Sequence, residues 1–123
     1  MSVQDINHVT LTGRVVEDST LKVTQGGRTL LRFSIASNER RTNPQTGELE
    51  DYPNFINCAI FGQYAESAQR FIKKGVPVSV DGHLRFTKWQ QDGKTRTNLE
   101  VYVDRIVAHD RYRPEAVRNG QSR

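Results

Sequence analysis

The amino-acid sequence predicts a small all-β barrel that carries a single helix. Apolar and polar residues alternate with a period of two in five segments of the chain, as they do in half-buried β-strands. One segment between the third and fourth of these has instead the three-to-four-residue apolar spacing of an amphipathic helix. With 123 residues, the chain is long enough for a single domain with one hydrophobic core.

The first strand is expected over residues 6–16, where apolar and polar residues alternate. Gly13 lies inside this segment, and a glycine within a strand is typical of a bulge or of a sharp bend at a barrel corner. Residues 21–24 are expected to continue the strand after a kink. A glycine-rich turn at residues 25–27 then leads to a second strand over residues 29–37.

Residues 38–54 are expected to form a long polar loop, because turn-forming residues are frequent there. The first part of this loop is basic, with Arg40 and Arg41, and its second part is acidic. Long loops are uncommon in compact domains and are often functional. The third strand runs from Phe55 to Phe61 and carries apolar residues on both faces. A core on one side of this strand does not account for both phenylalanines.

The helix is expected over residues 64–74, on its apolar spacing. Lys73 and Lys74 would lie in its last turn, where cations interact favourably with the helix dipole. Gly75 would form the C-terminal cap, a position that favours glycine. The two lysines therefore have a structural explanation as helix-terminal charges.

Residues 76–107 are expected to form a β-hairpin. The Asp-Gly pair at its turn can adopt the positive φ angles that tight hairpin turns require. In the first hairpin strand, Arg85, Thr87 and Trp89 share one face, because side chains alternate with a period of two. The other face is apolar and is expected to point into the core; it consists of Val76, Val78, Val80, Leu84 and Phe86.

The predicted elements follow the order of the OB-fold, a small Greek-key barrel: three strands, one helix and two further strands. We therefore predict an all-β protein, a five-stranded OB-fold Greek-key barrel with one helix between strands 3 and 4. Residues 1–109 are expected to form this domain. Residues 110–123 are basic and poor in apolar side chains, and we expect them to form a disordered tail.

Composition excludes several kinds of site and leaves others open. The single cysteine, Cys58, excludes an internal disulfide and a multi-cysteine zinc site, and the histidines show no ligand spacing. No cofactor, metal or enzymatic activity is expected, because no catalytic or phosphate-loop arrangement is visible. Neither a secretory signal nor a membrane-spanning stretch is visible, so a cytoplasmic protein is expected. The net charge of +4 is compatible with a polyanionic partner but does not establish one.

Motifs that are loose individually follow one another in a characteristic order along the chain. They are Ile6 to Arg14, Thr46-Gly47-Glu48, Phe55 to Glu66, Phe71 to Gly75, Val80 to Arg85 and Lys88-Trp89. Over residues 6 to 109 the chain resembles the DNA-binding domain of bacterial single-stranded DNA-binding proteins, the homotetrameric type with one OB-fold per subunit. The resemblance implies sequence-independent binding of single-stranded DNA in replication, recombination and repair, by a homotetramer that acts in the cytoplasm at the nucleoid.

The resemblance also implies roles for particular side chains. Aromatic rings stack on unpaired bases and cations neutralise phosphates, so such a site needs no contact with base edges. Stacking positions of the family are occupied by Phe55, Phe61 and Trp89. A further stacking position holds Arg41, whose guanidinium plane can also stack on a base. Basic positions of the family are matched by Arg85, Lys88, Lys73 and Lys74. The full set of candidate nucleic-acid-binding residues is Trp89, Phe55, Phe61, Arg85, Lys88, Arg41, Arg40, Lys73, Lys74 and Arg14.

Each candidate also has a purely structural explanation. Trp89 can pack on the hairpin turn, Phe55 can belong to the core, and Phe61 can pack under the helix. The arginines of the loop can simply be solvated. Other aromatic residues are not assigned to binding: Phe33, Phe71 and Phe86 are expected in the core, and Tyr64 and Tyr102 at packing or interface positions.

Two further functions remain open. An OB-fold assembly subunit of the primosome type would act mainly through protein contacts, and an RNA-binding OB module would prefer RNA to DNA. The family usually carries a long linker and an acidic C-terminal tip that recruits replication and repair proteins, whereas this chain ends in a basic segment. The sequence is thus either trimmed or a naturally tail-less form, and recruitment through such a tip is not assigned to it.

Overall fold

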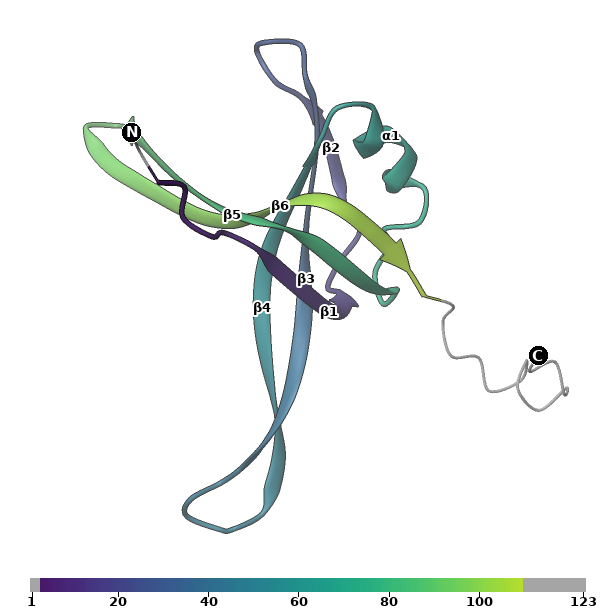
Figure 1. Cartoon of the computed structure of the whole chain (residues 1–123), viewed down its shortest axis with the longest axis vertical. Coiled ribbons are helices and arrows are strands. Elements are labelled where there is room, and N and C mark those ends of the chain that lie inside the picture. Colours follow the sequence, from purple (N-terminus) through teal and green to yellow (C-terminus); the bar gives the residue numbers. More distant parts are fainter. Residues whose placement is uncertain (1–2, 110–123) are drawn as a thin grey trace, which may run out of the picture.

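The computed structural model describes residues 3–109, and the tail expected at residues 110–123 lies outside the described residues. Figure 1 shows a coiled β-barrel from which a long two-stranded ribbon extends. The elements are β1 (Val9–Val15), β2 (Thr20–Val23), β3 (Thr29–Thr42), β4 (Leu49–Phe61), α1 (Gln63–Gln69), β5 (Pro77–Gln91) and β6 (Lys94–Ala108). For the described part of the chain, the predicted all-β fold with one helix is confirmed.

The strands form one sheet in the order β1-β5-β6-β4-β3-β2, and an additional pairing of β1 with β3 closes it into a barrel. Paired strands are antiparallel except β4 and β6, which run parallel. Residues 20–23 pair with β3 as a strand of their own. Helix α1 therefore follows the fourth strand rather than the third, a small correction to the predicted order.

Closure of the barrel involves a close approach of two backbones at Gly13. Strand β1 pairs with β5 from Val9 to Arg14, and β3 joins its other edge at Arg14 and Val15, directly after this glycine. A Cβ atom on Gly13 would lie 2.7 Å from the carbonyl oxygen of Ala36, which leaves no room for a side chain. The close approach of two backbones explains why a glycine lies inside this strand. The pairing of β1 with β5 continues through Gly13 without a register shift, so the bulge or bend expected from the sequence stays a prediction.

The core lies between the inner faces of the curved sheet, with α1 packed against it. Helix α1 contributes Ala65 and Ala68, which are fully buried. Phe33 is buried and Phe71 is partly buried against the same cluster, as predicted. The largest fully buried side chains are Leu31, Ile35, Ile60, Ile72, Val78, Val80 and Val101.

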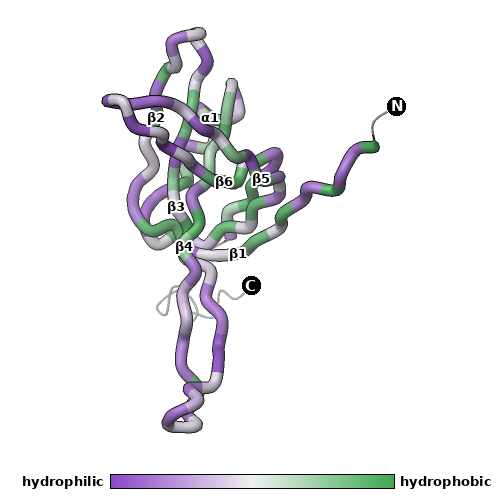
Figure 2. Tube along the Cα trace, turned by 90° about the vertical axis from the view of Figure 1, so that its left-hand side faces the viewer, coloured by the Kyte–Doolittle hydropathy of each residue, from purple (hydrophilic) through white to green (hydrophobic). Residues whose placement is uncertain are grey.

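Residues 38–54 form a β-ribbon, so the prediction of a long loop is wrong. Strands β3 and β4 stay in register as far as the pair Thr42 and Leu49. At the tip, the amide of Gly47 donates to the carbonyl of Asn43 at 2.7 Å and closes a tight turn. Figure 2 shows that the ribbon is hydrophilic, whereas hydrophobic segments gather in the barrel. Without an apolar face, these strands have no alternation by which a sequence reveals them.

Helix α1 ends at Gln69, so the prediction that Lys73 and Lys74 occupy its last turn is wrong. Contacts with the region of β1 draw the following segment into turns. The amide of Lys74 donates to the carboxylate of Asp18 at 2.9 Å, and the amide of Gly75 donates to the last carbonyl of β1 at 2.8 Å. Gly75 has a φ of 87° and serves the turn into β5 instead of capping the helix.

The C-terminal hairpin is confirmed. Asp92 and Gly93 in its turn have φ angles of 53° and 73°, as a tight hairpin turn requires. Its inner-face residues that are buried as predicted are Val76, Val78 and Val80.

Leu84 and Phe86 are 40% and 60% exposed, so the prediction that they face the core is wrong. A register shift between Asp81 and Gly82 marks the place where the hairpin bends. Beyond this bend the hairpin leaves the barrel (Figure 1), and within residues 3–109 its apolar side remains open to solvent.

Candidate nucleic-acid interface

The outer face of the barrel gathers the aromatic residues that the sequence singled out. Phe55 and Phe61 are six residues apart on β4, so both side chains leave the same side of the strand. At roughly 3.3 Å per residue they are about 20 Å apart along the strand. Phe55 is 67% exposed, which excludes the alternative that it belongs to the core.

The register between strands places Trp89 on this face as well. Ala59, which has the parity of the two phenylalanines, pairs with Tyr102 of β6, and Tyr102 pairs with His83 of β5. Arg85 and Trp89 have the parity of His83 and therefore point to the same side of the sheet. Trp89 is 44% exposed near the end of the hairpin. The candidate stacking rings and Arg85 thus share one exposed face.

Phe61 belongs to a group of aromatic and cationic side chains. The rings of Phe61 and Tyr102 have centroids 5.0 Å apart and planes inclined by 49°. The guanidinium of Arg28 lies 4.4 Å from the centroid of the Phe61 ring, and that of Arg85 lies 4.8 Å from the centroid of the Tyr102 ring. The ring of His83 is 5.9 Å from that of Tyr102. We call these five residues the Phe61 cluster.

Sequence reasoning missed three members of this cluster, namely Tyr102, Arg28 and His83. Tyr102 was expected at a packing or interface position, yet it alternates with Val101 and Val103, which are both buried. This alternation is a signal that its side chain points outward. No comparable signal marks Arg28, which follows a glycine-rich turn. Tyr64 packs as expected, because its hydroxyl donates to the carbonyl of Ile106 at 3.1 Å and accepts from the amide of the same residue at 2.8 Å.

A hollow of about 350 Å³ lies beside Asn57, between the two phenylalanines of β4. Its wall combines polar side chains, among them Arg32, Asn98 and Glu100, with the apolar Phe33 and Cys58. Glu100 is only 3% exposed, and its carboxylate accepts a hydrogen bond from Nη2 of Arg32 at 3.3 Å. This partner compensates the burial of the carboxylate. The middle of the outer face therefore carries polar side chains, with aromatic rings toward its ends.

Cys58 lies on the core side of β4 and is fully buried. Burial, together with the nearby charge of Glu100, raises the pKa of the Cys58 thiol to about 12. The thiol is therefore neutral at ordinary pH, which agrees with the expected role of a small buried hydrophobe.

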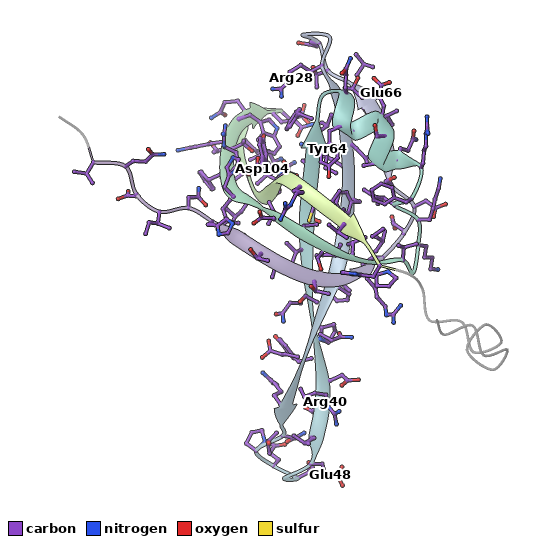
Figure 3. All side chains as sticks on the ribbon, turned by 45° about the vertical axis from the view of Figure 1, so that its right-hand side comes forward. Arg28, Arg40, Glu48, Tyr64, Glu66 and Asp104 are labelled. Atoms are coloured by element: carbon purple, nitrogen blue, oxygen red, sulfur yellow. The ribbon has the colours of Figure 1, made fainter. Side chains whose placement is uncertain are left out.

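The other cationic candidates do not contact the rings of Phe61 and Tyr102. Arg40 and Arg41 are on the ribbon, far from Arg28 at the opposite end of the molecule (Figure 3). Nε of Arg40 is 3.3 Å from Oδ1 of Asp51, and the guanidinium of Arg41 lies 4.2 Å from the centroid of the Tyr52 ring. Lys88, the neighbour of the tryptophan in the sequence, has the opposite parity and points to the other side of the hairpin.

Arg14, Lys73 and Lys74 form a separate cationic group near the end of β1. Nη1 of Arg14 donates to the carbonyl of Gly75 at 3.1 Å, which places it next to the turn that carries the two exposed lysines. The structure thus brings Arg85 together with the stacking candidates, and it places the other cations on three different parts of the surface.

An apolar surface lies on the opposite side of the hairpin. Leu84, Phe86 and Leu99 are 40%, 60% and 57% exposed, and Phe86 pairs with Leu99 across the two strands. We call these three residues the hairpin apolar patch. The edge of β1 that faces away from β5 has no partner strand from Val9 to Thr12 within residues 3–109. Both features are typical of surfaces that bind another chain.

The part of the chain that the structure describes has neither a metal-binding cluster nor a membrane-spanning helix. No group of three or more His, Cys, Asp and Glu side chains in residues 3–109 is arranged to hold a metal ion. The helical segment found there is too short to cross a membrane.

Residues 6–109 match the sequence model of the Single-strand binding protein family. The chain belongs to this family. Among members of the single-strand binding family, the Single-stranded DNA-binding protein of Borreliella burgdorferi is 40% identical over 104 residues, covering 83% of this chain and 68% of that protein. The protein of the same name from Treponema pallidum is 37% identical over 102 residues, covering 83% of this chain and 57% of that protein. The chain therefore spans between 57% and 68% of the length of these relatives.

Solved structures of single-strand binding proteins share the fold. A Plasmodium falciparum SSB in complex with ssDNA has a TM-score of 0.77 at 24% identity, and the match covers 89% of this chain and 100% of that chain. A deletion mutant of the single-stranded DNA binding protein from Thermus aquaticus has a TM-score of 0.74 at 24% identity, covering 85% of this chain and 51% of that chain. These similarities confirm the predicted OB-fold barrel.

Proposed function

We propose that this chain binds single-stranded DNA without sequence preference and protects it during replication, recombination and repair. The observation that carries the proposal is the position of Phe55, Phe61 and Trp89 on one outer face together with Arg85. A face of this composition stacks unpaired bases and neutralises phosphates. Family membership and the names of the relatives support the proposal.

Stacking on the three rings can supply a substantial part of the binding free energy, and phosphate contacts supply the remainder. Stacking one base on an aromatic side chain stabilises a complex by ~1–3 kcal/mol. Three rings therefore contribute roughly 3–9 kcal/mol as an upper limit, since neighbouring contacts are not fully additive. These contacts address the base faces and the phosphates, which every nucleotide has, so they produce no sequence preference.

The remaining cations belong to the same proposal as contacts for a longer strand. A strand that leaves the aromatic face would pass over the barrel, the ribbon and the C-terminal hairpin, where exposed cations attract its phosphates. The residues that we propose for this role are Lys88, Lys73, Lys74, Arg14, Arg40 and Arg41.

The fluorescence of Trp89, the only tryptophan of the chain, tests the proposal. We expect poly(dT) to quench it to saturation, duplex DNA of equal length to quench it little, and raised salt to weaken binding. Phe55→Leu is expected to weaken binding about tenfold. Phe86→Leu is the matched control, because it alters a similarly exposed ring on the opposite side of the sheet and is expected to leave affinity unchanged.

Three outcomes would contradict the proposal in different ways. Binding of poly(dT) without any change in Trp89 fluorescence would move the interface away from the outer face. Preference for poly(U) over poly(dT) would indicate an RNA-binding module. Absence of binding to either polymer would favour a protein-assembly role, and the hairpin apolar patch is the observation that supports that second candidate.

We also propose that the chain self-associates into a homotetramer. The hairpin apolar patch and the open edge of β1 are surfaces that a second copy can cover. The proposal makes the protein a binding module rather than an enzyme, and one that acts in the cytoplasm on the DNA of the nucleoid.

A further inference from the structure

We infer that Tyr102 is a base-stacking residue and that Arg28 and Arg85 bind the phosphates next to the bases stacked on Phe61 and Tyr102. The inference rests on the proposed function and adds a subsite to it. The ligand of this subsite is a dinucleotide step of single-stranded DNA, with one base for each ring.

The position of the Tyr102 ring follows from the parallel pairing of β4 with β6. Ala59 lies opposite Tyr102 in this pairing and is fully buried, although its side chain is on the outer side of β4. The small side chain of Ala59 leaves room for larger neighbours above it. Tyr102 and Phe61 lie close together there, with centroids 5.0 Å apart and planes inclined by 49°. The two rings therefore present two adjacent stacking surfaces instead of one flat surface.

The charges of Arg28 and Arg85 are available for a ligand. The ion pairs within residues 3–109 involve His8, Arg32, Arg40 and His83, and they include neither Arg28 nor Arg85. Each of the two guanidinium groups lies over an aromatic ring instead. In this respect they differ from Arg32 and Arg40, whose charges are already paired with carboxylates.

This arrangement allows partners to be exchanged when DNA binds. In the free protein the guanidinium groups cover the ring faces, a contact that is weak where water has access. A base stacked on a ring makes a stronger contact, and a phosphate offers arginine a charge-assisted, bidentate partner. When DNA binds, bases therefore replace the guanidinium groups on the rings of Phe61 and Tyr102. The guanidinium groups of Arg28 and Arg85 then bind phosphates instead of the rings.

Fluorescence anisotropy of a labelled oligo(dT), measured with the full chain at several salt concentrations, tests the inference. Tyr102→Leu removes the ring but keeps an apolar side chain, and we expect it to weaken binding about tenfold. Tyr102→Phe keeps the ring and is expected to bind within about twofold of the unmodified chain.

The arginines are tested by the slope of log K against log salt concentration. Arg28→Gln and Arg85→Gln are each expected to reduce this slope by about 0.7, the value for one phosphate contact on a single strand. Arg105→Gln is the charge-matched control, because Arg105 lines a different surface together with His8 and Asp81. It is expected to leave the slope unchanged.

A direct readout is photo-cross-linking with an oligonucleotide that carries 5-iododeoxyuridine, which is expected to yield an adduct at Tyr102. If the unmodified chain binds, but Tyr102→Leu binds equally well and no adduct forms at Tyr102, the subsite is refuted and the proposed function stands. Equal losses in Tyr102→Phe and Tyr102→Leu would assign the effect to the hydroxyl and overturn the stacking role. Failure of the unmodified chain to bind oligo(dT) would overturn both proposals. The urea midpoint of Tyr102→Leu is measured alongside. If this variant is unfolded, the subsite is tested by the cross-link at Tyr102 and by the salt slopes of Arg28→Gln and Arg85→Gln, and absence of both effects overturns it.

Discussion

Arg40 of β3 and Asp51 of β4 face each other across the ribbon, with Nε of the arginine 3.3 Å from Oδ1 of the aspartate. The next pair in register is Arg41 with Glu50, so basic residues of one strand lie opposite acidic residues of the other. Opposite charges in facing positions favour one register, although each exposed pair contributes little stability. Residues 38–54 have a basic first half and an acidic second half because the two halves are facing strands whose opposite charges pair.

The Arg40–Asp51 pair has separable effects on stability and on DNA binding. Asp51→Asn is expected to change the free energy of unfolding by less than about 1 kcal/mol, because both side chains are largely exposed. It is expected to strengthen binding of poly(dT), since it removes a negative charge and frees the guanidinium of Arg40. Urea unfolding and a salt-dependent titration measure the two effects. Asp92→Asn in the hairpin turn removes the same charge at a different place and serves as the control. If Asp51→Asn binds poly(dT) more weakly, Arg40 contributes to binding only when the ion pair with Asp51 fixes its position.

The close backbone contact at Gly13 is expected to tolerate no side chain. Gly13→Ala places a methyl group 2.7 Å from the carbonyl oxygen of Ala36, and it is expected to destabilise the fold by roughly 1–3 kcal/mol. Gly26→Ala is the matched control, because a Cβ atom there meets nothing within 4 Å. Urea midpoints compare the two variants, and equal midpoints would mean that the backbones at this contact can separate without cost.

Cys58 is expected to react with thiol reagents only after unfolding. The pKa of its thiol is about 12 in the folded chain against an ordinary value of 9.0, so the neutral form persists. Between pH 9 and pH 12 the unfolded chain loses this proton and the folded chain keeps it, so the stability contributed by Cys58 falls as pH rises. Labelling with a thiol reagent at pH 8, with and without urea, measures the first effect. The alkaline slope of stability in Cys58→Ala measures the second, and an unchanged slope would argue against it.

The hairpin apolar patch is expected to hold subunits together. Phe86→Glu places a charge at a surface that would otherwise be covered, so it is expected to reduce the molar mass measured by light scattering. Phe55→Glu carries the same change on the outer face; it is expected to lose DNA affinity and to keep the molar mass. If both variants keep the mass of the unmodified chain, the patch is not a subunit interface.

Local patterns predicted a large part of this fold. The C-terminal hairpin follows from period-two alternation and from Asp92-Gly93. Within each strand, parity placed Phe55 with Phe61 and Trp89 with Arg85. Whether these two pairs share one face depends on the register between strands. This register is a tertiary property, and the alternation within a single strand does not predict it.

Tertiary contacts also explain the predictions that are wrong. The ribbon lacks an apolar face, so backbone pairing and opposite charges specify it, and neither leaves a period-two pattern. The helix stops early because Lys74 and Gly75 bond to the region of β1, which is distant in the sequence. Arg28 reaches Phe61 only because β3 and β4 pair, so no local signal identifies it.

The parallel pairing of β4 with β6 means that the outer face cannot form until both of these strands have been synthesised. Phe61 leaves the ribosome well before Tyr102, and the two rings become neighbours only when β6 pairs with β4. A nascent chain that ends before β6 carries Phe55 and Phe61 but lacks the strand that completes the surface around them. The pair of rings therefore forms only after β6 has been synthesised and has paired with β4.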